Sequence, residues 1–196
     1  MRRVIRHSVF ETNSSSTHSL SISPNSTPIH FNLPLDAHNR ILAEFGEFDW
    51  GYEELKSPLQ KLSYLLTIVA VKELQYDSSV NPQILLANTP GFKLLDEWAR
   101  GFCDGISFKN LEMVATQYGE YGRPYIAFDG GLDHQSSSFY SSLQEFLSKT
   151  NLTIEEIILD SAIIIIIDSD NTSNKPQFPE GSKIIHLAYV DYPEYS

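Results

Sequence analysis

The feature that most constrains the fold is an apolar run, Ala162–Ile167, which contains five consecutive isoleucines. β-branched side chains favour strands, and a strand without polar alternation is typical of one that is buried on both faces. Such a strand must be covered by other elements. Ser57-Pro58 begins a helix that can supply this cover, because apolar residues follow at helical spacing as far as Leu74. We expect this helix to be buried and central.

Shorter helices and strands alternate along the rest of the chain. The predicted elements are helices at 90–102, at 138–149 and from Thr153, and strands at 40–45, 112–118, 125–128 and 183–190. We therefore predict an α/β or α+β fold, a single domain over residues 1–196 in which a mixed β-sheet packs with about four helices. Residues 1–23 are expected to form an extended, basic and serine-rich N-terminal segment.

The charge balance restricts the partners. The chain carries 25 acidic and 14 basic side chains, a formal net charge of −11. Such a field repels nucleic acid and attracts basic partners, so we expect a basic protein as the partner. Direct nucleic-acid binding is expected only through a basic arm at the N-terminus, formed by Arg2, Arg3 and Arg6. The alternative role of this arm is to blunt the edge of a sheet with charge.

The composition also restricts the compartment. Cys103 is the only cysteine, so the chain can form neither an intrachain disulfide nor a cysteine-ligated zinc site. The first residues do not resemble a signal peptide, and no apolar run approaches the roughly 20 residues that span a bilayer. We expect a cytoplasmic protein without membrane contact.

An unusual polar segment covers residues 11–19. If this segment is extended, Ser16 and His18 lie on one face, where they could act as nucleophile and base, or the hydroxyls could hold a phosphate. The alternative is a hydroxyl-rich turn whose side chains satisfy the local backbone. Ser16 and His18 are candidate catalytic residues. The candidate binding residues here are Glu11, Asn13, Ser14 and Ser15.

A second polar segment, residues 128–138, joins a predicted strand to a predicted helix. It contains Asp133 and His134 as candidate catalytic residues, followed by Gln135 and Ser136 as candidate binding residues. The alternative is that Ser136–Ser138 cap the following helix while Asp133 favours its dipole. No cofactor is predicted. A divalent metal is the one candidate, for which the possible ligands are His18, Asp129, Asp133 and His134.

A third segment, Glu44–Tyr52, interleaves aromatic residues with carboxylates. Glu47 and Trp50 are candidate binding residues, because exposed aromatics beside carboxylates suit protein contacts. The alternative is that the aromatic side chains at 45, 48 and 50 fill the core. Cys103 closes an apolar helix face, so we interpret it as a structural thiol rather than as a catalytic partner of His134.

These three segments resemble a family of uncharacterised proteins carried by phages, plasmids and other mobile elements of Gram-positive bacteria. The matching elements are Val-Phe-Glu-Thr-Asn-Ser-Ser-Ser-Thr-His-Ser at Val9–Ser19, Phe-Gly-Glu-Phe-Asp-Trp at Phe45–Trp50 and Asp-His-Gln-Ser at Asp133–Ser136. The family more usually has glycine where this chain has Asp49. The resemblance implies that the polar elements form a site. It also implies interference with host defence or host regulation, so the expected partner is a basic host or defence protein in the cytoplasm of the bacterial host.

Two functions follow from these observations. The first is an acidic binding protein, encoded by a phage or mobile element, that inhibits a host defence system in the manner of an anti-CRISPR protein, or inhibits another nucleic-acid-handling enzyme. The second is a hydrolase or nuclease-like enzyme that uses His18, Asp133 and His134. The enzyme hypothesis requires His18 and His134 to share one pocket, with the strand that ends near Leu20 beside the strand 125–128.

Overall fold

The structure is a computed structural model, and it describes residues 33–48, 53–75, 79–108, 111–114, 125–132, 140–167 and 183–187. Backbone contacts divide the chain into two units, residues 1–32 and 33–196, and every described residue belongs to the second unit. The extended N-terminal segment predicted for residues 1–23 therefore lies outside the described residues.

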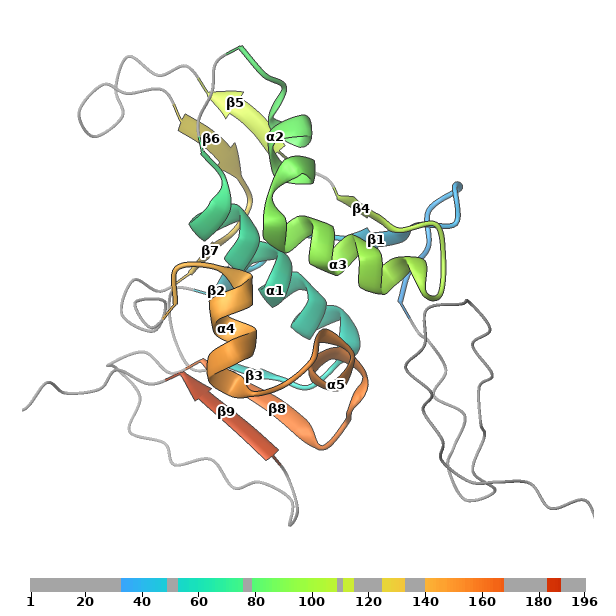
Figure 1. The fold of residues 1–196 in the computed structure, drawn as a ribbon, viewed down its shortest axis with the longest axis vertical. Coiled ribbons are helices and arrows are strands. Elements are labelled where there is room, and N and C mark those ends of the chain that lie inside the picture. The colour runs from blue at the N-terminus through green and yellow to red at the C-terminus, as the bar shows by residue number, and fades with distance from the viewer. Residues whose placement is uncertain are drawn as a thin grey trace, which may run out of the picture. The chain divides into compact units, whose positions relative to one another are not determined.

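The described residues contain five helices and nine strands (Figure 1). The helices are α1 (Pro58–Glu73), α2 (Pro82–Asn88), α3 (Pro90–Arg100), α4 (Leu143–Thr150) and α5 (Ile154–Leu159). The strands are β1 (Ile41–Ala43), β2 (Glu47–Phe48), β3 (Glu53–Leu55), β4 (Ile106–Phe108), β5 (Leu111–Val114), β6 (Tyr125–Phe128), β7 (Gly131–Leu132), β8 (Ile163–Ile167) and β9 (Lys183–Leu187). Parallel and antiparallel pairs both occur, which confirms the predicted mixed class.

Helix α1 forms the centre of the described core and begins where the sequence predicts. The Ser57 hydroxyl accepts a hydrogen bond from the Gln60 N–H, and the Gln60 side chain accepts one from the Ser57 N–H. This reciprocal capping box satisfies two donors that a helix start leaves without partners. Every residue from Tyr64 to Ala70 is buried, and α1 packs against all four other described helices (Figure 1).

The isoleucine run forms the middle strand of a three-stranded sheet. Strand β8 pairs with β3 in the antiparallel sense and with β9 in the parallel sense, so this sheet is mixed. All five isoleucines of β8 are buried. The prediction of a strand covered on both faces is confirmed.

Three shorter ladders complete the described strands. Strand β1 is parallel to β4, β2 is parallel to β7, and β5 is antiparallel to β6. The Phe45 ring connects these ladders, because it lies 6.2 Å from the Phe108 ring of β4 and 4.9 Å from the Phe128 ring of β6.

Some boundaries differ from the predictions. Helix α4 begins at Leu143 rather than at Ser138, because the Ser142 hydroxyl accepts the Glu145 N–H and acts as the N-cap. The interpretation of Ser136–Ser138 as the cap is therefore wrong. Helix α3 ends at Arg100, two residues before the predicted end. Helix α2 and strands β2, β3, β4 and β7 were not predicted from the sequence.

Candidate functional site

Most of the candidate residues lie outside the described part of the chain. These residues are Glu11, Asn13, Ser14, Ser15, Ser16, His18, Trp50, Asp133, His134, Gln135 and Ser136. The shared pocket of His18 and His134 consequently stays a prediction, as does the pairing of Leu20 with strand β6. Glu47 is the described member of the candidate set, and it lies on strand β2.

Strands β2 and β7 bring the second and third polar segments of the sequence together. They are parallel, with Glu47 opposite Gly131 and Phe48 opposite Leu132. The Gly131 N–H donates a hydrogen bond of 3.0 Å to the Gly46 carbonyl. We call residues 45–48 and 129–132 the β2–β7 junction. The carboxyl ends of both strands point in the same direction, and in α/β sheets such ends commonly carry ligand sites.

Helix α1 fixes the residues that lead into β2. The Thr67 hydroxyl accepts the Gly46 N–H at 3.0 Å and donates to the Ser63 carbonyl at 2.8 Å. The Ser63 hydroxyl in turn donates to the Glu44 carbonyl at 2.6 Å. Two hydroxyls on one face of α1 therefore hold the backbone of 44–46, so the β2–β7 junction is attached to the most buried helix of the domain.

Two aromatic residues of the third segment, Phe45 and Phe48, fill the core as the alternative interpretation predicts. Phe45 and Phe48 are only 8% and 6% exposed, and the Phe48 ring packs edge-on against the Tyr64 ring. Glu47 lies between them on β2 and is exposed. The junction therefore sends its aromatic groups into the core and presents a carboxylate to solvent. Trp50 lies outside the described residues.

Close approach of the two backbones makes Gly130 necessary at this junction. A Cβ atom on Gly130 would lie 2.8 Å from the Phe45 Cβ and 2.9 Å from the Gly46 carbonyl oxygen. Neither atom belongs to the end of a flexible side chain, so one of the strands would have to move.

We expect Gly130→Ala to lower the free energy of unfolding by about 2 kcal/mol, the usual range for an overpacked position. Gly101→Ala is the matched control, because Gly101 is exposed and has helical backbone angles (φ −67°, ψ −17°). Urea denaturation of the two variants measures the difference. Equal midpoints would show that the backbones at the junction are not in close contact.

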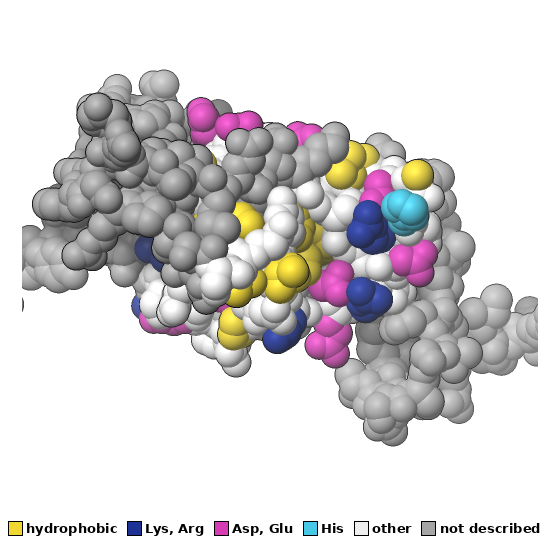
Figure 2. All heavy atoms as spheres, turned by 90° about the horizontal axis from the view of Figure 1, so that it is seen from above, with side chains coloured by type: hydrophobic (Ala, Val, Ile, Leu, Met, Phe, Trp, Pro, Cys, Tyr) yellow, Lys and Arg dark blue, Asp and Glu magenta, His cyan; other side chains and the backbone are white. Residues whose placement is uncertain are grey.

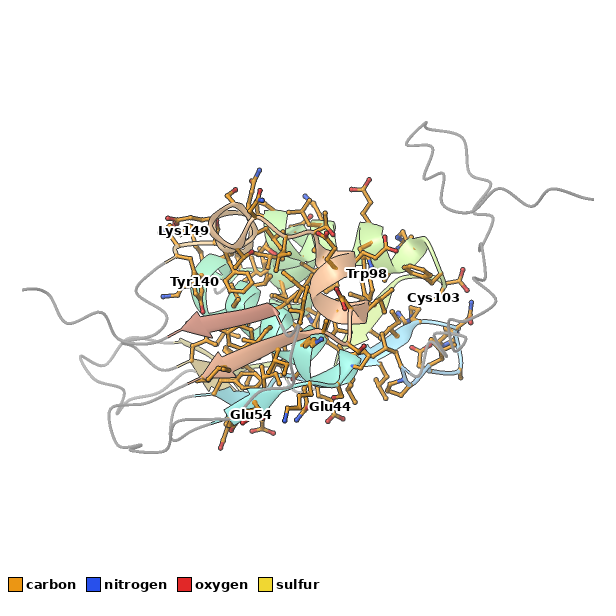
Figure 3. All side chains as sticks on the ribbon, turned by 90° about the horizontal axis from the view of Figure 1, so that it is seen from below. Glu44, Glu54, Trp98, Cys103, Tyr140 and Lys149 are labelled. Atoms are coloured by element: carbon orange, nitrogen blue, oxygen red, sulfur yellow. The ribbon has the colours of Figure 1, made fainter. Side chains whose placement is uncertain are left out.

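Further carboxylates lie close to the junction in sequence. Glu44 and Asp129 are exposed, and strand β3 adds the half-buried Glu53 and Glu54. Figure 3 shows Glu44 and Glu54 projecting from the same side of the ribbon. Glu53 precedes Glu54 directly on β3, so its side chain points to the opposite face of that strand. We call Glu44, Glu47 and Glu54 the acidic strip. Lys56 forms an ion pair with Glu54. The strip can attract cationic groups through its charge.

A second polar group lies along α1. The Tyr64 and Tyr140 hydroxyls are 2.7 Å apart and buried, and the Lys72 ammonium lies 5.7 Å from the centre of the Tyr140 ring. Burial raises the pKa of Tyr140 to about 12, although its hydrogen bond with Tyr64 opposes this rise. A phenol with this pKa stays neutral at physiological pH and keeps its hydrogen bond with Tyr64. This hydrogen bond holds residue 140 against α1.

The surroundings of Cys103 agree with its interpretation as a structural thiol. Its thiol is half-buried and lies 3.3 Å from the carbonyl oxygens of both Ala99 and Gly105. These contacts help to close the turn between α3 and β4. His134, the alternative partner, lies outside the described residues.

Within the described ranges, no group of three or more His, Cys, Asp or Glu side chains is placed to hold a metal ion. The candidate metal ligands His18, Asp133 and His134 are outside these ranges, so the metal hypothesis stays a prediction. Among the same described residues, no helix is long and apolar enough to cross a membrane.

Sequence reasoning missed one buried charge that organises the core. Lys61 is fully buried, and its ammonium donates a hydrogen bond of 2.8 Å to the Asp160 carbonyl at the C-terminal cap of α5. Burial lowers the pKa of Lys61, and the nearby Asp160 carboxylate partly offsets this. A signal was present in the sequence, because Lys61 is the one charged residue between Pro58 and Val71.

Comparison with known proteins adds no relative. No protein-family model matches the chain, and neither the curated proteins nor the solved structures give a match. The resemblance to mobile-element proteins at Val9–Ser19, Phe45–Trp50 and Asp133–Ser136 therefore stays a prediction.

Proposed function

We propose that the chain is an acidic binding protein of a phage or other mobile element, which docks on a basic surface of a host protein. The partner we expect is a defence enzyme, such as a CRISPR effector, or another enzyme that handles nucleic acid. Binding of an acidic protein to such a surface would exclude the nucleic acid that the surface normally binds.

The observation that carries the proposal is the concentration of negative charge in one unit. Residues 33–196 contain 24 acidic and 11 basic side chains, a net charge of −13. Residues 1–32 contain three arginines and one glutamate, a net charge of +2. The unit that contains the described fold is thus more acidic than the chain as a whole. Long-range attraction of a basic partner follows from this field.

The acidic side chains are not distributed evenly over that unit. On the face shown in Figure 2, basic and acidic side chains are interspersed. Among the described residues, ion pairs join Arg40 to Asp36 at 2.8 Å and Arg100 to Asp96 at 2.7 Å. Residues 44–54 contain five carboxylates and no basic residue, and the next basic residue, Lys56, pairs with Glu54. We therefore assign the docking face to the acidic strip rather than to the face in Figure 2.

The anti-defence role rests on the resemblance and on the charge together. A mobile-element protein whose negative charge matches the basic clefts of nucleic-acid enzymes has a direct route to inhibition. The competing hydrolase hypothesis places its chemistry on His18, Asp133 and His134. No described residue favours the hydrolase over the binding protein.

The test of the proposal is capture of a partner from a bacterial lysate with the full chain, followed by binding kinetics with the recovered protein. We expect a basic, nucleic-acid-binding protein whose nucleic acid is displaced by the chain. The association rate should fall as salt rises from roughly 50 to 200 mM, since charges farther apart than about 10 Å are then screened. Binding that does not change with salt would contradict the proposal.

Charge reversal locates the docking face. We expect Glu44→Lys with Glu47→Lys to reduce the association rate roughly tenfold, because steering charges act mainly on the rate of encounter. The matched control is Glu97→Lys with Glu155→Lys, which changes the net charge by the same amount at exposed positions on α3 and α5. Equal losses in the two double variants would show that the whole field steers binding and that the strip is not the docking face.

A further inference from the structure

One carboxylate, at the last residue of α1, contacts the starts of two other helices. Glu73 Oε2 accepts the Gly91 N–H at 2.6 Å, and Glu73 Oε1 accepts the Leu143 N–H at 2.9 Å. Gly91 is the second residue of α3, and Leu143 is the first residue of α4. The first turn of a helix has N–H groups without partners inside the helix, and it favours negative charge. Glu73 satisfies one such donor in each helix.

The caps of the two helices leave these donors to Glu73. The Thr89 hydroxyl accepts the Phe92 N–H of α3, and the Ser142 hydroxyl accepts the Glu145 N–H of α4. Each N-cap side chain is thus occupied by a residue further into its own helix. The carboxylate of Glu73 completes both starts.

The packing around Gly91 is adapted to this carboxylate. A Cβ atom on Gly91 would overlap Glu73 Oε1 and would lie 2.7 Å from Val69 Cγ2. A side chain at position 91 would therefore displace either the carboxylate or the helix. α1 packs against both α3 and α4, whereas the described residues of α3 and α4 share little contact with each other.

We propose that Glu73 couples the start of α3 to the start of α4, so that stabilising or loosening one helix start has the same effect on the other. Both acceptor oxygens belong to one carboxylate. A movement of this carboxylate that follows one helix start therefore also moves the acceptor of the other helix start. A ligand that orders the start of either helix would stabilise the other start through the same contact, since such coupling is reciprocal. This inference is independent of the proposed partner.

Amide hydrogen exchange on the full chain, followed by NMR, tests the coupling. Ser142→Ala removes the cap of α4 and alters no atom of α3. We expect it to increase the exchange rate of the Gly91 amide at least about threefold, within the range of coupling between residues of one network. Thr153→Ala is the matched control, because Thr153 is the N-cap of α5 and has the same capping role. It should leave the Gly91 rate unchanged relative to the other amides of α3.

Glu73→Gln tests whether the carboxylate carries the effect. In a glutamine one of the two terminal atoms is an NH2 donor, so the side chain cannot accept the Gly91 N–H at one atom and the Leu143 N–H at the other. We expect it to speed exchange at Gly91 or Leu143 roughly tenfold, as loss of a charge-assisted hydrogen bond predicts. In this background, Ser142→Ala should have no further effect on Gly91.

Three results would overturn the coupling. They are no change at Gly91 in Ser142→Ala, the same change in Thr153→Ala, or a Ser142→Ala effect that persists in Glu73→Gln. If Glu73→Gln fails to fold, the comparison of Ser142→Ala with Thr153→Ala decides alone.

Discussion

Leu65→Asp is expected to unfold the protein. Leu65 is fully buried in the middle of α1, and the helix packs on every other described helix. A carboxylate at this position would be charged without a partner in the core, or would have to become protonated at a large cost in free energy. The expected loss of more than about 4 kcal/mol is comparable with the whole stability of an ordinary domain.

The control for this prediction lies on the same helix. Leu59 is 38% exposed, so Leu59→Asp keeps the new charge in contact with water and should change the stability by less than about 1 kcal/mol. Thermal unfolding followed by circular dichroism separates the two variants. A soluble Leu65→Asp protein with the wild-type midpoint would show that α1 is not the centre of the core.

The elements that could be predicted are those whose sequence patterns are local. α1 has a capping residue, a proline at its first position and an apolar middle, and all of these act within one segment. β8 is a run of isoleucines that cannot be placed at a surface. α2 carries the same signal at Asn81-Pro82 but is only seven residues long, too short to show a clear helical period.

The short strands could not be predicted, because their pairing is not local. β2 and β7 have two residues each and are stabilised by one another across more than 80 positions of sequence. β1 and β4 pair in the same way, with Ile41 opposite Ile106. A two- or three-residue strand has no period of its own, so only the partner strand defines it.

In the candidate site, too, local features could be predicted and contacts between distant segments could not. The alternative for the third segment, that the aromatic side chains at 45, 48 and 50 fill the core, is confirmed by the burial of Phe45 and Phe48, and Trp50 lies outside the described residues. Sequence reasoning did not bring this segment to Gly130 and Gly131, because the contact depends on the path of the chain between them. Glu73 was missed for a related reason, since the donors that it satisfies lie 18 and 70 residues away.

Alkaline pH should destabilise the protein through Tyr140. Burial raises the pKa of this phenol from 10 to about 12 in the folded protein, and the residue is only 4% exposed. Between these two pH values the unfolded chain loses the phenol proton while the folded protein keeps it, so stability falls as pH rises. The stability linked to Tyr140 is fully present below pH 10 and is lost as the pH rises through 12. The loss should reach about 1.4 kcal/mol at pH 11, with a limit of about 2.7 kcal/mol for a shift of two units.

Tyr140→Phe isolates this contribution. Lys61 and Lys72 have the opposite effect on the pH dependence of stability. Burial lowers the pKa of each, so their contributions to the free energy of unfolding increase as the pH rises toward 10.5. Both lysines remain in the variant, so the difference between the wild type and Tyr140→Phe reports the tyrosine. Urea denaturation at pH 8, 9, 10 and 11 should show the wild type losing stability above pH 10 more steeply than the variant. Parallel curves would mean that the phenol ionises without unfolding the protein, and that the Tyr64–Tyr140 contact is open to water.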